Sequence, residues 1–515
     1  MTTYRPSGFL DILRLPFIGR LLRWRYGRLI FQLPLTLFAI LLIIDGFMGP
    51  QIASRNLATI AAWVHYRGLI VLVLLLAGNF FCMGCPFTLP RTLAKGLSIR
   101  GRRFPRVLRN KWLTIGSLLL LFFLYEWLDL WASPALTAWV IIVYFVVSFV
   151  MEAVFTESAF CKYVCPLGTF NFVYSTASPT QITVRDRHVC QTCVGKECIN
   201  GSYRPIMPIV PSSDTSRDVC ATDASRDACT TNASRDIYLT SAPKPNGVLG
   251  CGTQLFAPQI RSNMDCTLCL DCARACPHNN VGLMVHAPGK ELIQPNAWSK
   301  RWDLSFLVIS LAFMGISNAF GMVPPVYEMM NGLARVFGLT QSGLPNMVIE
   351  AIVLLILFVV GNVALPLVLT LTVAWISRQL TGSRKRYSQR EVVAAFAPAF
   401  VPLGLGIWIA HYSFHFLIGA TSIIPVLQEF LGWSPNWALA TSPFDLSFVS
   451  LVQLVALVGS FLLSMMIAQR AALRLFRRRG VIGLLPWALL LLAMMVVSIQ
   501  IFTLPMEMRG SIVFD

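Results

Sequence analysis

The sequence Cys-Thr-Leu-Cys-Leu-Asp-Cys-Ala-Arg-Ala-Cys-Pro occupies residues 266–277. Its cysteines, Cys266, Cys269, Cys272 and Cys276, have the spacing with which bacterial ferredoxins hold [4Fe–4S] clusters. Zinc also binds four thiolates, but its sites usually combine two separated Cys-x-x-Cys pairs. Three cysteines at two-residue gaps, followed by Cys-Pro, therefore predict an iron–sulfur cluster and a protein that transfers electrons.

A second set of cysteines precedes this run. Cys190, Cys193 and Cys198 are closely spaced, and Cys251 follows after a long gap. Together with the first run they supply enough ligands for two [4Fe–4S] clusters. In two-cluster ferredoxins the last cysteine of each motif binds the other cluster. That rule groups Cys276 with the first three residues, and Cys251 with the other three cysteines of the run.

The segment near residues 212–240 contains a tandem repeat in which Ser-Arg-Asp recurs every nine residues. Short copies of this kind are typical of a solvent-exposed loop. Cys220 and Cys229 lie in register within the repeat and lack cluster spacing to a neighbour, so we leave them out of the predicted ligands. A redox-sensing thiol pair is the alternative for these two residues.

The composition predicts a membrane protein. Hydrophobic residues make up 56% of the 515 residues and charged residues only 13%, unlike a typical soluble chain. Nine apolar stretches approach the length of about 20 residues that spans a bilayer. They lie at 29–49, 68–86, 112–132, 136–156, 303–323, 348–375, 392–418, 448–469 and 481–503. We therefore expect an all-α polytopic membrane protein with about nine transmembrane helices.

The distribution of basic residues predicts the orientation of the chain. A net charge of +18 would suit nucleic acid, but the cations gather in alternate connections between the apolar stretches, so we expect no nucleic acid partner. Basic connections mark the cytoplasmic side, which predicts an inner-membrane protein with its N-terminus inside and its C-terminus outside. The basic connections are 20–28, 91–111, 378–390 and 470–479; the others are 50–67, 324–347, 419–447 and 504–515.

Three domains are expected from this order. Residues 1–165 form an N-terminal membrane module with four helices, residues 166–300 a cytoplasmic ferredoxin-like α+β insertion, and residues 301–515 a C-terminal membrane module with five helices. Thiols stay reduced in the cytoplasm, so cluster ligation explains the cysteines of the insertion better than disulfides. Residues 8–25 mix Phe and Leu with Arg, which predicts either an interfacial helix or a plain tether.

Four further cysteines lie at predicted helix ends. Cys82 and Cys85 end the second span, Cys161 and Cys165 follow the fourth, and each pair closes with Cys-Pro. Both spans reach the cytoplasmic edge of the membrane, where four thiolates can converge on a metal or a further iron–sulfur centre. Buried thiols that pack as small apolar side chains are the alternative.

Electrons at this edge would still face about 30 Å of hydrocarbon. They would end at a quinone or continue through another carrier. His65, His411 and His415 are predicted on the outer side as candidate haem or copper ligands, although a His pair on one helix face is more often simply hydrogen-bonded. Glu126 and Asp129 are candidates for proton transfer, because acids in or near a span commonly serve function.

Two of these motifs, Phe-Cys-Met-Gly-Cys-Pro-Phe at 81–87 and Cys-Lys-Tyr-Val-Cys-Pro-Leu-Gly at 161–168, occur together with the ferredoxin segment. Over about residues 29–290 the chain thereby resembles the membrane polyferredoxins. That family includes the quinol-dehydrogenase subunit of periplasmic nitrate reduction, the maturation protein of nitrous-oxide reduction and the iron–sulfur accessory protein of cytochrome oxidase assembly. The first motif is one residue short of the family's Cys-x-x-x-Cys-Pro pattern. The resemblance implies membrane electron transfer linked to quinol, a periplasmic reductase or metal-centre assembly.

Three functions follow as hypotheses. The first is a membrane-bound, oxidoreductase-type iron–sulfur protein that passes electrons between a cytoplasmic redox partner and quinone or a periplasmic acceptor. The second is a copper-reducing or metal-centre assembly factor for a periplasmic or membrane reductase or oxidase. The third is a cluster-containing transporter or redox sensor. The C-terminal half carries no phosphate loop or zinc-protease helix that would favour another chemistry.

Overall fold

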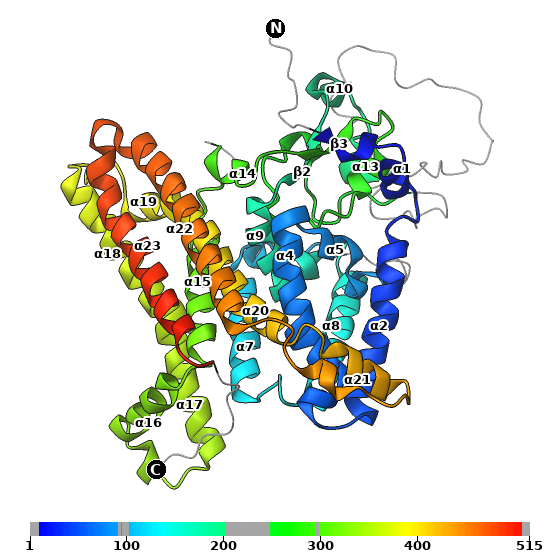
Figure 1. The fold of residues 1–515 in the computed structure, drawn as a ribbon. Coiled ribbons are helices and arrows are strands. Elements are labelled where there is room, and N and C mark those ends of the chain that lie inside the picture. Colours follow the sequence, from blue (N-terminus) through cyan, green and yellow to red (C-terminus); the bar gives the residue numbers. More distant parts are fainter. Residues whose placement is uncertain (1–9, 91–93, 95–101, 202–247, 295–297, 507–515) are drawn as a thin grey trace, which may run out of the picture.

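The computed structural model describes residues 10–90, 94, 102–201, 248–294 and 298–506. The repeat near 212–240, with Cys220 and Cys229, lies outside these residues. Figure 1 shows two parts: long helices that run side by side, and a unit of short helices and strands at one end of them. We name the second part the cysteine-rich unit; it comprises residues 10–23, 178–201 and 248–294.

Seven helical segments of the described chain are long and apolar enough to cross a membrane. This confirms the predicted multi-pass helical architecture in outline. One segment, Leu446–Thr503, contains two predicted spans, because α22 (Leu446–Phe476) and α23 (Gly480–Thr503) are joined by a turn and pack along each other. The stretch predicted at 112–132 forms α7 (Trp112–Trp127), which at 16 residues is shorter than a typical spanning helix. The number nine therefore stays a prediction.

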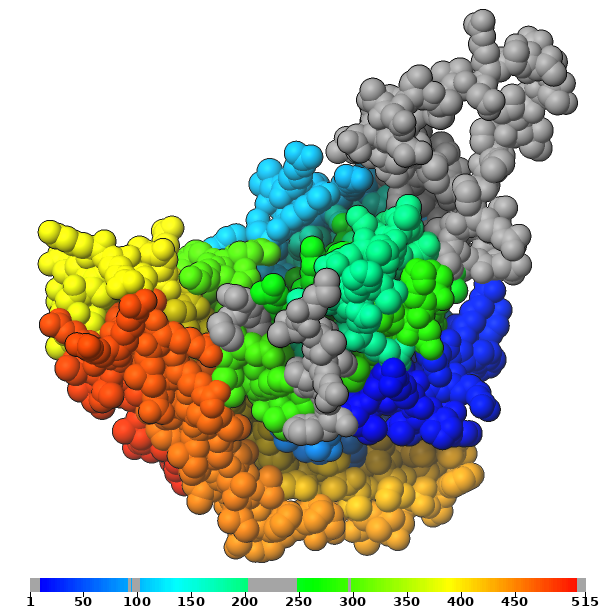
Figure 2. All heavy atoms as spheres, turned by 90° about the horizontal axis from the view of Figure 1, so that it is seen from above, coloured from blue at the N-terminus to red at the C-terminus, as the bar shows by residue number. Residues whose placement is uncertain are grey.

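The other helices complete the bundle. Figure 2 views the molecule from the side of the cysteine-rich unit, with the yellow to red C-terminal helices beside that unit. Two short amphipathic helices, α16 and α21, lie at the opposite end (Figure 1). The bounds are α2 (Leu29–Met48), α8 (Pro134–Val154), α16 (Pro325–Val336), α17 (Asn346–Val359), α18 (Leu365–Leu380), α19 (Gln389–Phe396) and α21 (Ile423–Phe430).

The second membrane helix begins and ends earlier than the sequence predicted. It covers Leu57–Ala77, whereas the apolar pattern predicted 68–86. Arg67, which we assigned to an outer connection, consequently lies within the helix. The predicted start was too late because the polar residues Arg67 and His65 interrupt an otherwise apolar run, which made this part of the helix look like a connection. The segment consists of α3 (Leu57–Thr59), the π-helical η3 (Ile60–Tyr66) and α4 (Arg67–Ala77).

A glycine separates this helix from the first cysteine pair. Gly78 ends α4 with a φ of +71°, a conformation that glycine adopts without steric penalty. A Cβ at this position would also lie only 2.8 Å from the hydroxyl oxygens of Ser178 and Thr180. Cys82 therefore lies past the membrane helix, on the separate short helix α5 (Phe80–Gly84).

The cysteine-rich unit contains a three-stranded antiparallel sheet in the order β1-β3-β2. Its strands are β1 (Leu10–Asp11), β2 (Thr180–Val184) and β3 (Val281–Val285). Both Leu10 and Thr180 lie opposite Val285, so the N-terminal residues and the end of β3 share one sheet.

The N-terminal segment therefore packs into this unit, a contact that the predicted alternatives of an interfacial helix or a tether did not include. Leu13 and Leu22 are buried in the same core as Ile182. The Asp11 carboxylate fixes the segment, because it accepts hydrogen bonds from the N–H of Leu13 at 3.0 Å and from Nε of Arg185 at 2.8 Å. Leu22 lies on α1 (Ile18–Arg23).

The two predicted membrane modules share one hydrophobic core. Its centre is α20 (Phe400–Ile418), which packs against α4, α22 and α15 (Trp302–Phe320). Trp408 on α20 is fully buried and donates its indole N–H to the carbonyl oxygen of Leu311 at 3.2 Å. The C-terminal helices thus support the helices that lead to the cysteines.

Candidate functional site

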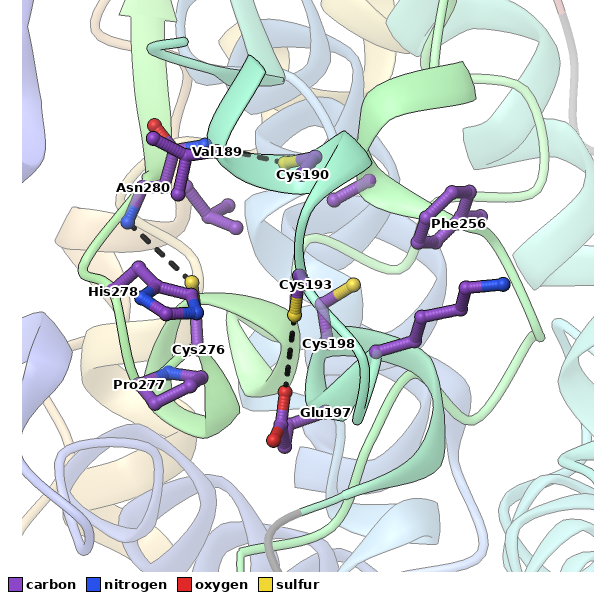
Figure 3. Close-up of a pocket in the computed structure, with 13 residues that line it drawn as sticks. Val189, Cys190, Cys193, Glu197, Cys198, Phe256, Cys276, Pro277, His278 and Asn280 are labelled. Carbon is purple, nitrogen blue, oxygen red and sulfur yellow. Dashed lines mark hydrogen bonds between the residues drawn. The ribbon is translucent and has the colours of Figure 1, made fainter. Parts of the chain in front are cut away.

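Four cysteines line one recess of the cysteine-rich unit (Figure 3). They are Cys190, Cys193, Cys198 and Cys276, and we name them the first site. Asn280 holds two of them: its Nδ2 donates to Sγ of Cys190 at 3.2 Å, and its backbone N–H donates to Sγ of Cys276 at 3.4 Å. The grouping matches the two-cluster pattern, in which the last cysteine of one motif joins the other set.

Short helices present these cysteines near the surface. Cys190 lies on α10 (Arg187–Gln191), which begins where the carboxylate of Asp186 accepts the N–H of His188 at 2.8 Å. Val194, between Cys193 and Cys198, is 96% exposed. The first site therefore lies where a soluble protein can approach it. Cys198 lies on α11 (Glu197–Asn200), and Cys276 follows α13 (Asp271–Ala275).

The second site consists of Cys251, Cys266, Cys269 and Cys272. The last three are buried. Burial raises the pKa of their thiols most, and the negative charge of Cys251 raises each pKa further. The four sulfurs consequently lie near one another in surroundings that disfavour a bare thiolate.

The backbone of the second site is bent by two left-handed residues. Leu268 and Leu270 have φ values of +50° and +61°, a conformation that costs non-glycine residues on the order of 1 kcal/mol or more. Both side chains are buried in the core of the unit, and this burial offsets the cost. The turns allow three cysteines at two-residue gaps to wrap around one position.

The remaining cysteines form the third site, at the end of the membrane helices. Cys82, Cys85, Cys161 and Cys165 line a second recess. Asn171 donates its Nδ2 to Sγ of Cys82 at 3.4 Å. Both pairs predicted at the membrane edge are therefore brought together, although they are far apart in the chain.

Each Cys-Pro pair of the third site begins a helix. Cys165 precedes α9 (Pro166–Tyr174), and its Sγ accepts the N–H of Gly168 at 3.1 Å. Cys85 likewise precedes η4 (Pro86–Thr88). Proline suits the first helical position because it lacks the N–H that would be unpaired there. Burial raises the pKa of the Cys165 thiol, and the hydrogen bond from the N–H of Gly168 opposes this rise.

The three sites adjoin one another in order. The backbone N–H of Cys251 donates to the carbonyl oxygen of Cys198 at 3.0 Å, which joins the second site to the first. Thr267, the neighbour of Cys266, lines the recess of the third site. Nδ2 of Asn79 also donates to the carbonyl oxygen of Cys266 at 2.8 Å. The second site thus lies between the other two.

The donors of all three sites are thiols, which suit both iron–sulfur clusters and zinc. Within the described ranges, no three or more His, Cys, Asp and Glu side chains are grouped so as to hold one metal ion. Four cysteines line each of the recesses of the first and third sites. Zinc draws four sulfurs to about 2.3 Å from one point, whereas a cubane separates its ligands on different irons.

The three candidate histidines differ in their surroundings. Nδ1 of His65 lies 3.1 Å from the oxygen of Ile60, and Nε2 lies 3.2 Å from the oxygen of Ala420. His411 and His415 lie side by side with ring centroids 5.3 Å apart. Three of their four ring nitrogens have no hydrogen-bond partner in the described structure. His411 and His415 therefore remain candidate ligands, whereas backbone oxygens engage both nitrogens of His65.

The two candidate acids also differ. Glu126 is buried near the end of α7, and Nδ2 of Asn318 donates to its Oε1 at 3.0 Å. Asp129 is only half-buried, in the turn between α7 and α8, with a φ of +43°. Glu126 is thus the acid enclosed among the membrane helices.

Two arginines that make buried contacts near these residues were not singled out from the sequence. Arg67 is 7% exposed, donates to the Tyr125 hydroxyl at 3.1 Å, and lies over the ring of Tyr125 at 4.2 Å. Arg28, which we had assigned only to a basic connection, contacts both the second and third sites. Neither position has a local sequence signal, because each partner comes from a distant segment.

Comparisons with protein families, curated proteins and solved structures find no match for this chain.

Proposed function

We propose that this chain is a membrane-bound iron–sulfur protein that passes electrons between a cytoplasmic redox partner and quinone or a periplasmic acceptor. One observation carries the proposal: the twelve cysteines of the described residues fall into three adjoining sets of four. Isolated structural thiols would have no reason to gather in fours. The motifs that resemble the membrane polyferredoxins support the same function.

The first and second sites would each hold a [4Fe–4S] cluster, and the third a further iron–sulfur centre. Such groups accept and release single electrons. The protein supplies the thiol ligands, the hydrogen bonds to sulfur from Asn280 and Asn171, and the surroundings that limit access of water.

The order of the sites indicates which end of the proposed electron route faces a soluble partner and which end faces the membrane helices. The first site lies beside exposed residues such as Val194, where a soluble redox protein can dock. The third site lies at the end of the membrane helices, beside α5 and α9. The basic connections favour placing all three on the cytoplasmic side. A quinone in the membrane would then be the nearest acceptor or donor.

The proposal is tested by iron and acid-labile sulfide analysis of anaerobically purified protein, together with EPR spectroscopy. Three cubanes correspond to about twelve irons per chain, and two to about eight. A stoichiometry of zero to one iron would contradict the proposal. Stoichiometric zinc, with no reducible EPR signal, would contradict it as well.

Metal handling is a second candidate function, favoured by the unpartnered ring nitrogens of His411 and His415. Imidazole binds copper well, and a pair four residues apart presents both rings on one helix face. Copper titration of wild type and a His411→Asn/His415→Asn variant tests it. This function requires one tightly bound copper that the double variant lacks, while the iron content of both proteins stays equal.

A further inference from the structure

Arg28 lies between the second and third sites, at the beginning of α2. Its Nε donates to the carbonyl oxygen of Met83 at 2.8 Å, and its Nη2 donates to Oγ1 of Thr88 at 2.7 Å. Met83 stands between Cys82 and Cys85 in the chain. The guanidinium group therefore holds the loop that carries half of the third site.

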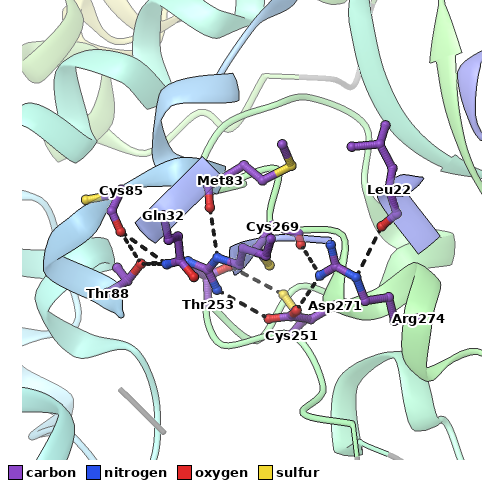
Figure 4. A network of polar contacts seen from close by, with 11 residues as sticks. Leu22, Gln32, Met83, Cys85, Thr88, Cys251, Thr253, Cys269, Asp271 and Arg274 are labelled. Atoms are coloured by element: carbon purple, nitrogen blue, oxygen red, sulfur yellow. Dashed lines mark hydrogen bonds and ion pairs between the residues drawn. The ribbon is translucent and has the colours of Figure 1, made fainter. Parts of the chain in front are cut away.

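The same guanidinium group reaches the second site. Its Nη1 lies 3.8 Å from Oδ2 of Asp271, which stands between Cys269 and Cys272. Nη1 of Arg274 lies 3.0 Å from Oδ1, the other carboxylate oxygen of Asp271. The same nitrogen donates to the carbonyl oxygen of Cys269 at 2.7 Å. Figure 4 shows Cys85 and Thr88 on one side of this network, and Cys269 and Asp271 on the other.

The environment makes the charge of Arg28 effective at both sites. The Arg28 side chain is 14% exposed, so water screens its charge less than on an open surface. Its guanidinium nitrogens contact the segments that carry both sites, at Met83 and Thr88 on one side and at Asp271 on the other. Arg274, in contrast, contacts the loop of the second site and the carbonyl oxygen of Leu22, and none of its hydrogen bonds in the described structure reaches the third site.

We propose that Arg28 sets the reduction potentials of the second and third sites together. The inference rests on the proposed function, because it requires redox centres at both sites. Reduction adds one electron, and hence one negative charge, to each centre. A nearby cation stabilises the more negative state and raises its reduction potential. A shared cation raises both potentials, so it changes the difference between them less than it changes either one.

The experiment is an EPR-monitored redox titration of anaerobically purified wild type, Arg28→Gln and Arg28→Lys. Cys272→Ser and Cys165→Ser assign the signals of the second and third sites, because each removes one of them. Arg28→Gln is expected to move both signals to more negative potentials. Arg28→Lys keeps the charge and is expected to leave both closer to their wild-type values.

Gln32→Leu is the matched control. Nε2 of Gln32 donates to the oxygen of Cys85 at 3.2 Å and to Oγ1 of Thr88 at 3.0 Å. It therefore shares the Thr88 contact with Arg28 and holds the same segment of the third site, but it carries no charge. It is expected to leave the signal of the second site unmoved. A shift in the reduction potential of the second site in Gln32→Leu would show that loop packing, and not charge, sets that potential.

Two results would overturn the inference while the proposed function stands: unchanged potentials in Arg28→Gln, or a shift at one site only. If Arg28→Gln loses its iron, Asp271→Asn replaces it. Removal of this negative charge is expected to move the signal of the second site to more positive potentials, and no shift there would refute the electrostatic account. A wild-type protein without both signals would instead overturn the proposed function.

Discussion

The backbone N–H of Cys251 donates a 3.0 Å hydrogen bond to the carbonyl oxygen of Cys198, although the two cysteines belong to different sets of four. The bond places the first and second sites next to each other. It also ties Cys251, which is far from any motif in sequence, to the segment that carries Cys190, Cys193 and Cys198. The grouping of the cysteines is consequently open to a direct test.

If the first and second sites hold the proposed [4Fe–4S] clusters, Cys276→Ser removes that of the first site, and Cys251→Ser that of the second. Each change takes away one of four thiolates, so each variant should lose about four irons and one EPR signal. Cys198→Ser is the control for the first site and should lose the same signal as Cys276→Ser. If Cys276→Ser instead removes the signal that Cys269→Ser removes, the grouping is wrong.

Cys165→Ser separates metal ligation from helix capping at the third site. Serine is among the preferred helix N-cap residues, so its hydroxyl can replace the sulfur that accepts the N–H of Gly168. We expect the variant to keep its thermal stability but to lose the iron of the third site. Iron analysis and thermal unfolding measure the two effects. Full iron content in Cys165→Ser would show that this thiol has a structural role.

The stability of the cysteine-rich unit is expected to depend on Glu291. Burial raises the pKa of this carboxyl group to about 7 from its usual 4.5, although His286 and the N–H of Asn263 lower it. The folded state therefore binds the proton more tightly than the unfolded state. The contribution of this proton binding to the free energy of unfolding is complete below about pH 4.5 and is lost as the pH rises through about 7. It amounts to at most about 3 kcal/mol.

Hydrogen exchange of peptides that cover residues 260–294 measures this effect at pH 5 and pH 7.5. Wild type should lose protection between the two values, after correction for intrinsic exchange. Glu291→Gln keeps an acceptor for the N–H of Asn263, which lies 2.7 Å from Oε2, but cannot titrate. Its protection should change less with pH. An equal change in both proteins would contradict the prediction.

Arg67→Met is expected to lower the thermal unfolding temperature. The substitution removes a buried cation from the ring of Tyr125, at 4.2 Å, and from that of Trp63, at 4.6 Å, and it takes away a hydrogen bond to the Tyr125 hydroxyl. These losses correspond to about 1–3 kcal/mol. Circular dichroism in detergent follows the transition. Arg67→Lys keeps the charge but not the planar group, so its unfolding temperature should lie between those of the wild type and Arg67→Met. An unchanged or higher unfolding temperature in Arg67→Met would refute a stabilising role of Arg67.

The sequence determined the broad class of this protein. Hydropathy depends on composition and length alone, so the long apolar helices could be predicted from local stretches. The cysteine spacing of residues 266–277 is also local, since it is set by chain connectivity. Even so, local hydropathy placed the second membrane helix wrongly, because Arg67 is polar in sequence but buried among aromatic rings in the fold.

Only the tertiary structure decided which distant groups meet. Leu10 pairs directly with Val285, although the N-terminal membrane helices lie between them in the sequence. No periodicity in residues 8–25 indicated this pairing. The thiols of the third site converge because the segments that begin at α5 and end at α9 line one recess, where Asn171 also donates a hydrogen bond to Cys82. Arg28 reaches two sites because α2 begins between them. The physical reason is common to all three: spacing along the chain limits only near neighbours, whereas contacts between distant segments depend on how the helices pack.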